Sequence, residues 1–244
     1  PPGWYAISAT SLKLGLLLQN QDMYAYFQAP QPAARVGYSI YLYEIEENPN
    51  ERVQRRTVVG QSVSDIPFAN FELGEEARFI AKWTARDEVK ILSSDQNLTL
   101  PANFLPIEAQ FDFGLRLWGG AVDQKPLVPN ETVSLTLYWQ VDNVTFPNPN
   151  PASGGPLRAF VHLSAVEDPT QIIAQYDGWE TALTGLESGD TIVHPISLQL
   201  PTEIAAAEYQ LRLGLYNPQS GERWFVESGE ETADFVTLAP LFSP

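Results

Sequence analysis

The sequence contains no cysteine, and this absence excludes several kinds of site. A chain of 244 residues without cysteine can form no disulfide, no thiolate metal site and no cysteine nucleophile. Its two histidines, His162 and His194, are not accompanied by the cluster of Asp and Glu that a metal site would need. We therefore interpret both as ordinary strand or edge histidines and expect no metal and no cofactor.

Basic residues are also scarce. The chain has 14 Lys and Arg against 30 Asp and Glu, which gives a net charge of −16. Such a chain has little with which to displace counterions from phosphates, so we expect no nucleic-acid partner. An anionic membrane surface is disfavoured for the same reason. The acidity is explained most simply by the solubility of a domain that faces solvent.

Long apolar runs and the common catalytic motifs are missing as well. The longest apolar run, residues 14–18, is far too short to span a bilayer. The chain has no signal peptide and begins with Pro1, Pro2 and Gly3, so we interpret it as a fragment or processed product whose membrane anchor would lie before Pro1. No G-x-S-x-G, H-E-x-x-H or glycine-rich phosphate loop occurs. We therefore predict no catalytic residue in this chain.

The features that are present indicate a folded, strand-rich protein. Hydrophobic residues make up 44% of the chain and aromatic residues 11%, with 20 prolines and 16 glycines to punctuate short strands. The strongest local pattern lies in residues 208–224, where apolar side chains alternate from residue 209 to 215 and a Pro/Gly turn follows at 217–221. Residues 223–226 then resume the strand pattern, so a β-hairpin is predicted.

The C-terminal half has the pattern of an antiparallel β-sandwich. Alternation is cleanest in residues 133–141, and turn residues separate the successive strand patterns. We predict a sandwich of about eight strands over residues 105–244, with a long loop at 146–156. Its core is expected to include the apolar side chains Val133, Leu135, Leu137, Trp139, Leu211, Leu213 and Leu215. Its remaining strands are predicted at residues 111–117, 159–163, 172–176, 192–200 and 235–238.

The N-terminal half is predicted to be a small α/β unit over residues 1–104. A strand at 4–10, which residues 12–18 could extend, a short helix at 22–28 and a strand at 34–45 form its centre. Both faces of the strand at 34–45 are apolar, so we expect it to be central in its sheet. Further strands are predicted at residues 55–59, 77–83, 89–92 and 97–100, and a domain boundary near 101–106.

One candidate ligand site stands out, formed by Asp177, Trp179 and Glu180. A glycosidase needs two carboxylates on opposite sides of a sugar, whereas these two lie close together in a predicted Asp-Gly turn. Catalysis is therefore disfavoured. Trp179 could instead stack on a sugar that the carboxylates hydrogen-bond, bury itself in a protein interface, or pack as a turn tryptophan on its own sandwich.

Two stretches resemble a known family. The first, PPGWYAISATSLKLG followed by DMYAYFQAPQPAARVGYSIYLYEI, resembles the extracytoplasmic segment after the membrane helices of bacterial glycosyltransferases related to dolichyl-phosphate-mannose–protein mannosyltransferases. The second, comprising LTLYWQ, AFVHLSAV, IIAQYDG, GDTIVHPISLQLP and EYQLRLGLYNPQSGERW, is similar to a β-sandwich module at the C-terminal end of such proteins, especially in Chloroflexi-like bacteria. His194 stands where that module usually has an Asp.

The resemblance implies a role outside the membrane. Family members use a polyprenyl-phosphate sugar, and their catalytic acidic residue lies between membrane helices, with no counterpart in this chain. We therefore expect a soluble, extracytoplasmic accessory domain, non-catalytic by itself, that acts in recognition or docking. Its expected partner is a membrane-embedded protein segment or membrane complex, or a glycan. The alternatives are a structural or interaction subunit and a free carbohydrate-binding sandwich.

Overall fold

The computed structural model shows a mainly β protein whose described residues form two compact units. It describes residues 3–14, 17–18, 21–22, 27, 30–46, 52–60, 77–123, 126–142, 157–183, 185–218, 220–228 and 231–242. The units comprise Pro1–Ala81 and Lys82–Pro244. Every strand pair that is described is antiparallel, so the predicted mainly β fold is confirmed.

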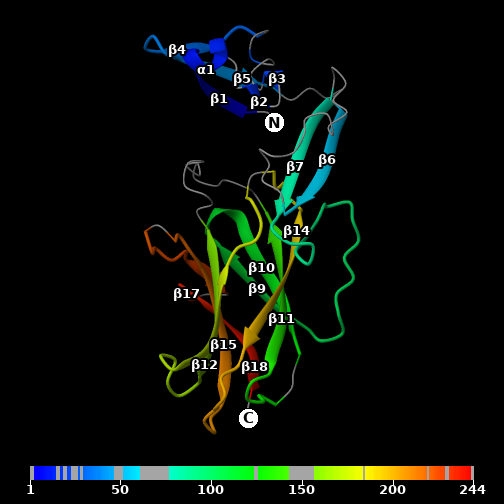
Figure 1. Ribbon diagram of the computed structural model, residues 1–244, viewed down its shortest axis with the longest axis vertical. Coiled ribbons are helices and arrows are strands. Elements are labelled where there is room, and N and C mark those ends of the chain that lie inside the picture. The colour runs from blue at the N-terminus through cyan, green and yellow to red at the C-terminus, as the bar shows by residue number, and fades with distance from the viewer. Residues whose placement is uncertain are drawn as a thin grey trace. The chain divides into compact units, whose positions relative to one another are not determined.

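The second unit is a sandwich of two antiparallel sheets (Figure 1). One sheet has the strand order β17-β16-β9-β10-β11-β14-β8, and the other has the order β13-β12-β15-β18. The strands are β8 (Lys90–Leu92), β9 (Phe104–Phe111), β10 (Leu115–Val122), β11 (Thr132–Val141), β12 (Arg158–Ala165), β13 (Ile172–Gly178), β14 (Thr191–Gln199), β15 (Tyr209–Tyr216), β16 (Val226–Ser228), β17 (Glu231–Ala233) and β18 (Val236–Phe242).

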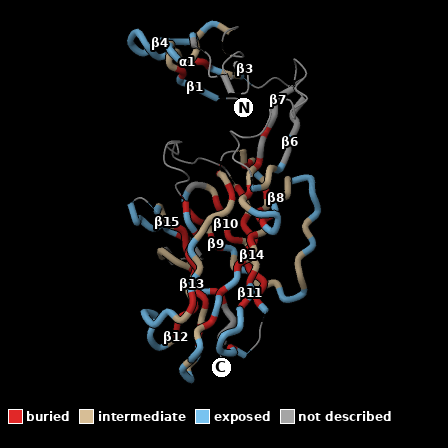
Figure 2. Tube along the Cα trace, viewed as in Figure 1, coloured by how far each residue is buried: buried red, intermediate tan, exposed pale blue. Residues whose placement is uncertain are grey.

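The core of the sandwich lies between its two sheets. Figure 2 shows buried residues concentrated along the sandwich strands. On β11 and β15 the predicted core positions are all buried, which confirms the alternation as the signal of an inward face. The residues concerned are Val133, Leu135, Leu137, Trp139, Leu211, Leu213 and Leu215.

The predicted hairpin after β15 forms only at its turn. Its strands are joined by a bridge between Tyr216 and Arg223. They are also joined by hydrogen bonds from the Asn217 amide to the Glu222 carbonyl (2.8 Å) and from the Trp224 amide to the Leu215 carbonyl (2.9 Å). Beyond this point the edge of β15 is occupied by β18. The chain therefore crosses to the other sheet, where Val226 of β16 pairs with β9, and the predicted pairing with β15 is wrong only for residues 225–226.

The alternation predicted over residues 111–117 is interrupted by a turn. Phe111 ends β9, a 3-10 turn follows at Asp112–Gly114, and Leu115 begins β10. The two strands pair with each other, with Leu115 opposite Phe111. Alternation alone gave no sign of this reversal, because both flanking residues are core residues.

The units divide between Ala81 and Lys82, earlier in the chain than the predicted boundary between residues 104 and 105. The reason is that the segment between these two points belongs to the sandwich. Strand β8 pairs with β14, with Ile91 opposite Ile192, and both side chains are buried. Residues 97–100 form no strand, and the predicted loop at 146–156 lies outside the described residues.

The first unit contains three small antiparallel sheets, β1-β5-β4, β2-β3 and β6-β7. One short helix, α1, follows β1 directly. The Ser8 hydroxyl accepts a hydrogen bond from the Ser11 amide (2.9 Å) and so caps α1 at its N-terminus. The elements are β1 (Gly3–Ser8), α1 (Ala9–Leu14), β2 (Leu17–Leu18), β3 (Gln21–Asp22), β4 (Ala34–Val36), β5 (Ile40–Ile45), β6 (Arg52–Val59) and β7 (Ala77–Thr84), the last of which crosses the division between the units.

Two predictions for the first unit need correction. The strand predicted over 34–45 is a hairpin, because Gly37 adopts a left-handed conformation (φ 60°) and turns the chain between β4 and β5. Only its second half, β5, is central in the sheet. Of the residues 12–18 predicted to extend the first strand, 12–14 belong to α1 instead, and Leu17 and Leu18 form β2. The helix predicted from Asp22 lies mostly outside the described residues, and Asp22 itself ends β3.

Candidate functional site

The structure separates the three residues of the predicted ligand site. Asp177 is exposed on β13, and both of its carboxylate oxygens lie 2.8 Å from the Tyr216 hydroxyl, which donates to the carboxylate. Glu180 instead accepts a hydrogen bond from Nε of Arg86 (2.7 Å) and forms an ion pair with the same guanidinium. The two carboxylates therefore have different partners and do not converge on one ligand.

Trp179 is half-buried and packs on its own sandwich. Its ring centroid lies 5.5 Å from that of Trp139 and 5.8 Å from that of His194, in edge-to-face contacts. Its indole N–H is buried without a hydrogen-bond partner among the described residues. A ring held in this way has little free face to offer a sugar, so the contacts of Trp179 favour the third of its three possible roles, a tryptophan packed on its own sandwich.

Next to Trp179, the buried His194 and the half-buried Tyr176 form a polar pair. His194 lies on β14, is 1% exposed, and its Nε2 is 3.0 Å from the Tyr176 hydroxyl. Burial, with a smaller contribution from Arg86, lowers the pKa of the His194 imidazole to about 4, and burial also raises the pKa of Tyr176. Both groups are therefore neutral at neutral pH. His194 is a core strand residue, and a substrate has no access to it.

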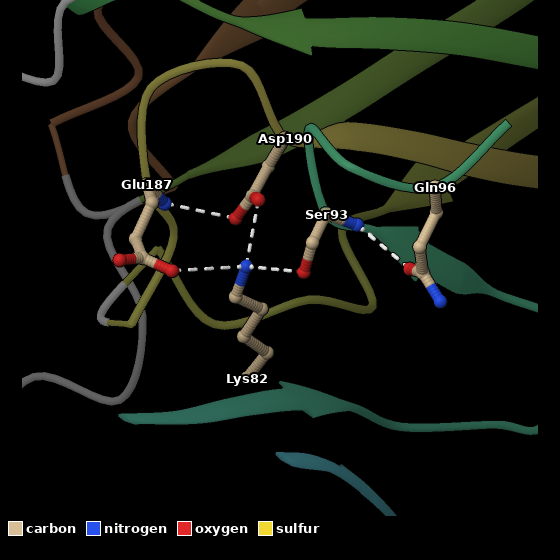
Figure 3. Close-up of polar contacts among 5 residues, drawn as sticks. All are labelled: Lys82, Ser93, Gln96, Glu187 and Asp190. Carbon is tan, nitrogen blue, oxygen red and sulfur yellow. Dashed lines mark hydrogen bonds and ion pairs between the residues drawn. The ribbon is translucent and has the colours of Figure 1, made fainter. Parts of the chain in front are cut away.

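Sequence reasoning missed a buried charge cluster around Lys82 (Figure 3). The Lys82 ammonium donates to Asp190 Oδ1 (2.6 Å) and Ser93 Oγ (3.0 Å), and lies 3.2 Å from Glu187 Oε2. The second oxygen of Asp190 accepts a hydrogen bond from the Glu187 amide (2.8 Å). The cluster ties β7 to the segment after β8 and to the loop before β14.

Lys82 is an anchor for these segments. An ammonium group has three donors, and here three acceptors are within reach, so the arrangement satisfies the buried charge. A nucleophilic lysine would need a free amine. The sequence carried one weak signal for this cluster. Lys82 alternates along β7 with Ile80 and Thr84, which are both buried, so it belongs to the inward face of the strand.

A polar face on the outside of the smaller sandwich sheet is a second candidate site. We call it the Arg–His face, and it comprises Arg158, Phe160, His162, Gln175, Asp177, Arg212, Tyr216 and Arg223. Backbone pairing sets Gln175, His162 and Arg212 side by side across β13, β12 and β15. The adjacent row of the pleat holds Asp177, Phe160 and Gly214.

Aromatic rings support the guanidinium groups of this face. Arg223 lies over the Phe160 ring at 4.6 Å and pairs with Asp234 (2.7 Å), while Arg212 lies over the Phe235 ring at 3.8 Å. The Phe160 ring occupies the space above Gly214, where a Cβ would come within 2.6 Å of it. Stacking on rings holds planar guanidinium groups in defined orientations.

A third candidate lies in the first unit. One face of the sheet β1-β5-β4, which we call the apolar sheet face, is formed by alternate residues of its strands. Trp4 is 62% exposed, Val36 54% and Ile40 38%. On the opposite face Ile7 and Tyr43 are buried, and there Phe27 packs between Tyr5 and Tyr43 with ring centroids 5.2 Å apart in each pair. The apolar sheet face comprises Trp4, Ala6, Ala34, Val36, Ile40 and Leu42, with Ser8 and Glu44 at the same parity of β1 and β5.

The fold therefore defines the chain as an antiparallel β-sandwich preceded by a smaller, mainly β unit. The chain matches no protein-family model and no curated protein. Within the described part of the chain, no three His, Asp or Glu residues are grouped so that they could hold a metal ion. No helix among the described residues is long and apolar enough to cross a membrane.

Proposed function

We propose that this chain is an outward-facing, non-catalytic accessory domain of a glycosyltransferase-like membrane protein, and that it acts by docking and recognition. Two observations support the proposal. One is the resemblance of the stretches at residues 1–45 and 135–224 to the segments that follow the membrane helices in that family. The other, which carries the docking role, is the apolar sheet face of the first unit.

The apolar sheet face has fewer polar residues than is usual for a sheet face exposed to solvent. Antiparallel sheets with one solvated face normally place polar residues on it, and a contiguous exposed apolar patch commonly marks an interaction site. Here Trp4, Val36 and Ile40 are exposed together, and Glu44 is the only charged side chain at that parity of β1, β4 and β5. The chain as a whole has a net charge of −16, so a face with a single charged side chain stands out from it and is suited to an apolar partner.

The occupant we propose is an outward-facing part of a membrane-embedded protein segment. It can be tested with a photoreactive p-benzoylphenylalanine in place of Trp4, in cells that make the full-length protein. We expect ultraviolet light to cross-link this position to an integral membrane protein segment identified by mass spectrometry. The matched control places the same residue at Ile172, which is 40% exposed in the other unit, and we expect no such product there.

Three results would overturn the docking proposal. They are equal cross-linking from both positions, products formed only with soluble proteins or a second copy of the chain, and no product at all. The coding sequence before Pro1 gives an independent test of the parent protein. Many hydrophobic spans there support a membrane glycosyltransferase, whereas a single signal peptide or anchor favours a structural subunit or a free carbohydrate-binding sandwich.

A further inference from the structure

We propose that the Arg–His face of the sandwich binds an acidic glycan, one whose sugars carry carboxylates. This inference goes beyond the docking proposal, because it concerns the other unit, a different surface and a different ligand. It depends on the geometry of one row of side chains, on the positive charge of that row and on the polar character of the face.

The row is formed by Gln175, His162 and Arg212 on three adjacent strands. Neighbouring strands lie about 4.8 Å apart, so the row spans roughly 10 Å of a rigid sheet. It presents an amide, an imidazole and a guanidinium in line. The amide and the imidazole can both donate hydrogen bonds to sugar hydroxyls and accept hydrogen bonds from them. The guanidinium can only donate.

Two arginines of the Arg–His face, Arg212 in the row and Arg158 near it, form no ion pair within the described part of the chain. Arg212 donates only to the Pro169 carbonyl (3.4 Å), and Arg158 only to the Asp177 carbonyl (3.4 Å). Neither forms an ion pair with a carboxylate among the described residues. A guanidinium binds carboxylates through two parallel hydrogen bonds, so these two arginines are suited to the acid groups of a glycan.

His162 completes the row as a neutral group. It lies half-buried, with its ring centroid 4.9 Å from that of Phe160. Burial lowers the pKa of the imidazole, and the charges of Arg223 and Arg212 lower it further. At neutral pH its ring nitrogens, which have no hydrogen-bond partner among the described residues, can therefore accept one hydroxyl proton and donate another.

The polar character of the face favours a glycan over a protein partner. Protein interfaces depend on a buried apolar or aromatic core. On this face Phe160 is only 5% exposed and lies under Arg223. None of the eight residues of the face is aliphatic, and Ile172, elsewhere on the edge strand β13, is 40% exposed. What remains accessible is a set of hydrogen-bonding groups around the half-buried ring of Tyr216.

The test uses the full chain and trigalacturonate as the acidic glycan. Galactotriose serves as the uncharged sugar, and a tri-glutamate peptide as the acidic ligand without sugar hydroxyls. We expect calorimetry to detect binding of trigalacturonate alone. Arg212→Gln should weaken this binding at least about tenfold, because a charge-assisted hydrogen bond is lost. Lys90→Gln, which removes an exposed positive charge on the other sheet, should leave it unchanged.

Histidine NMR of the unmodified protein gives a readout that does not depend on a variant's folding. The chain has only two histidines, so their imidazole signals are easily told apart. Trigalacturonate should shift the signals of His162 and leave those of the core residue His194 in place. Equal binding of the peptide, binding of galactotriose as tight as that of trigalacturonate, or no shift at His162 would each overturn the inference. None of these results bears on cross-linking from Trp4.

Discussion

Lys82 Nζ lies 2.6 Å from Asp190 Oδ1, and both side chains are only 2% exposed. The two residues are 108 positions apart in the sequence. Removing the charge of Asp190 leaves the buried Lys82 ammonium with Glu187, 3.2 Å away and partly exposed, as its remaining counterion. Asp190→Asn should therefore lower the free energy of unfolding by about 2–3 kcal/mol, as measured by urea denaturation.

The exposed ion pair of Arg223 and Asp234 supplies the control for that measurement. Each of these side chains is 42% exposed, so Asp234→Asn should cost less than about 1 kcal/mol. The double variant Lys82→Met with Asp190→Leu should recover much of the lost stability, because it removes both charges together. Equal losses for Asp190→Asn and Asp234→Asn would show that the buried pair is not an anchor.

Leu137 tests the packing of the sandwich core. Its side chain is fully buried on β11, so Leu137→Ala removes apolar contacts and leaves a cavity. We expect a loss of about 2–5 kcal/mol in the free energy of unfolding. Val128→Ala, at a position that is 40% exposed, should change it by less than about 0.5 kcal/mol. A loss that small at Leu137 would place this face of β11 in solvent.

His194 should make the stability of the protein depend on pH in a defined window. Its pKa is about 4 in the folded protein and about 6.5 in an unfolded chain, so the unfolded state binds more protons between these values. The contribution of neutral His194 is fully present above pH 6.5 and is lost as the pH falls to 4. The loss amounts to about 3 kcal/mol.

Comparison with His194→Gln isolates this effect from the titration of carboxylates. Glutamine keeps a hydrogen-bonding group near the Tyr176 hydroxyl but does not titrate. Urea denaturation at pH 7, 5.5 and 4.5 should show the wild-type protein losing more stability than the variant with each step. Parallel pH profiles for the two proteins would mean that His194 is solvated and keeps its ordinary pKa.

Trp179 should contribute to stability and should not report glycan binding. Its ring packs against Trp139 and His194, so Trp179→Ala should lower the free energy of unfolding by about 2 kcal/mol. Trp4→Ala, at a position that is 62% exposed, should change it by less than about 0.5 kcal/mol. If a glycan quenched fluorescence in the wild-type protein but not in Trp179→Ala, Trp179 would be a sugar platform after all.

The isolated chain should transfer no sugar. Under the proposed function, the catalytic acidic residue belongs to the membrane-embedded part of the parent protein and not to this chain. Incubation with a polyprenyl-phosphate sugar and candidate acceptor proteins should therefore give no product detectable by mass spectrometry. Turnover that a substitution within this chain abolishes would contradict the non-catalytic role.

Much of the sandwich could be predicted from the sequence, because a strand with one buried face has apolar residues at every second position. The alternation over β11 and β15 predicted both their extents and their buried side chains. Prediction failed where the chain changes direction without a clear break in the apolar pattern. The apolar pattern over residues 34–45 predicts one central strand, although the chain turns at Gly37. The alternation over residues 111–117 likewise predicts a single strand, although the chain turns after Phe111.

The candidate sites depended more heavily on the tertiary structure. Asp177 and Trp179 share a parity in the sequence, yet β13 ends at Gly178, so alternation no longer fixes the direction of Trp179. The residues themselves determined that the chain is acidic, strand-rich and without cysteine. Only the folded chain decided that Lys82 meets Asp190 and that His162 stands beside Arg212, because such contacts depend on which strands pair, and no local pattern records that choice.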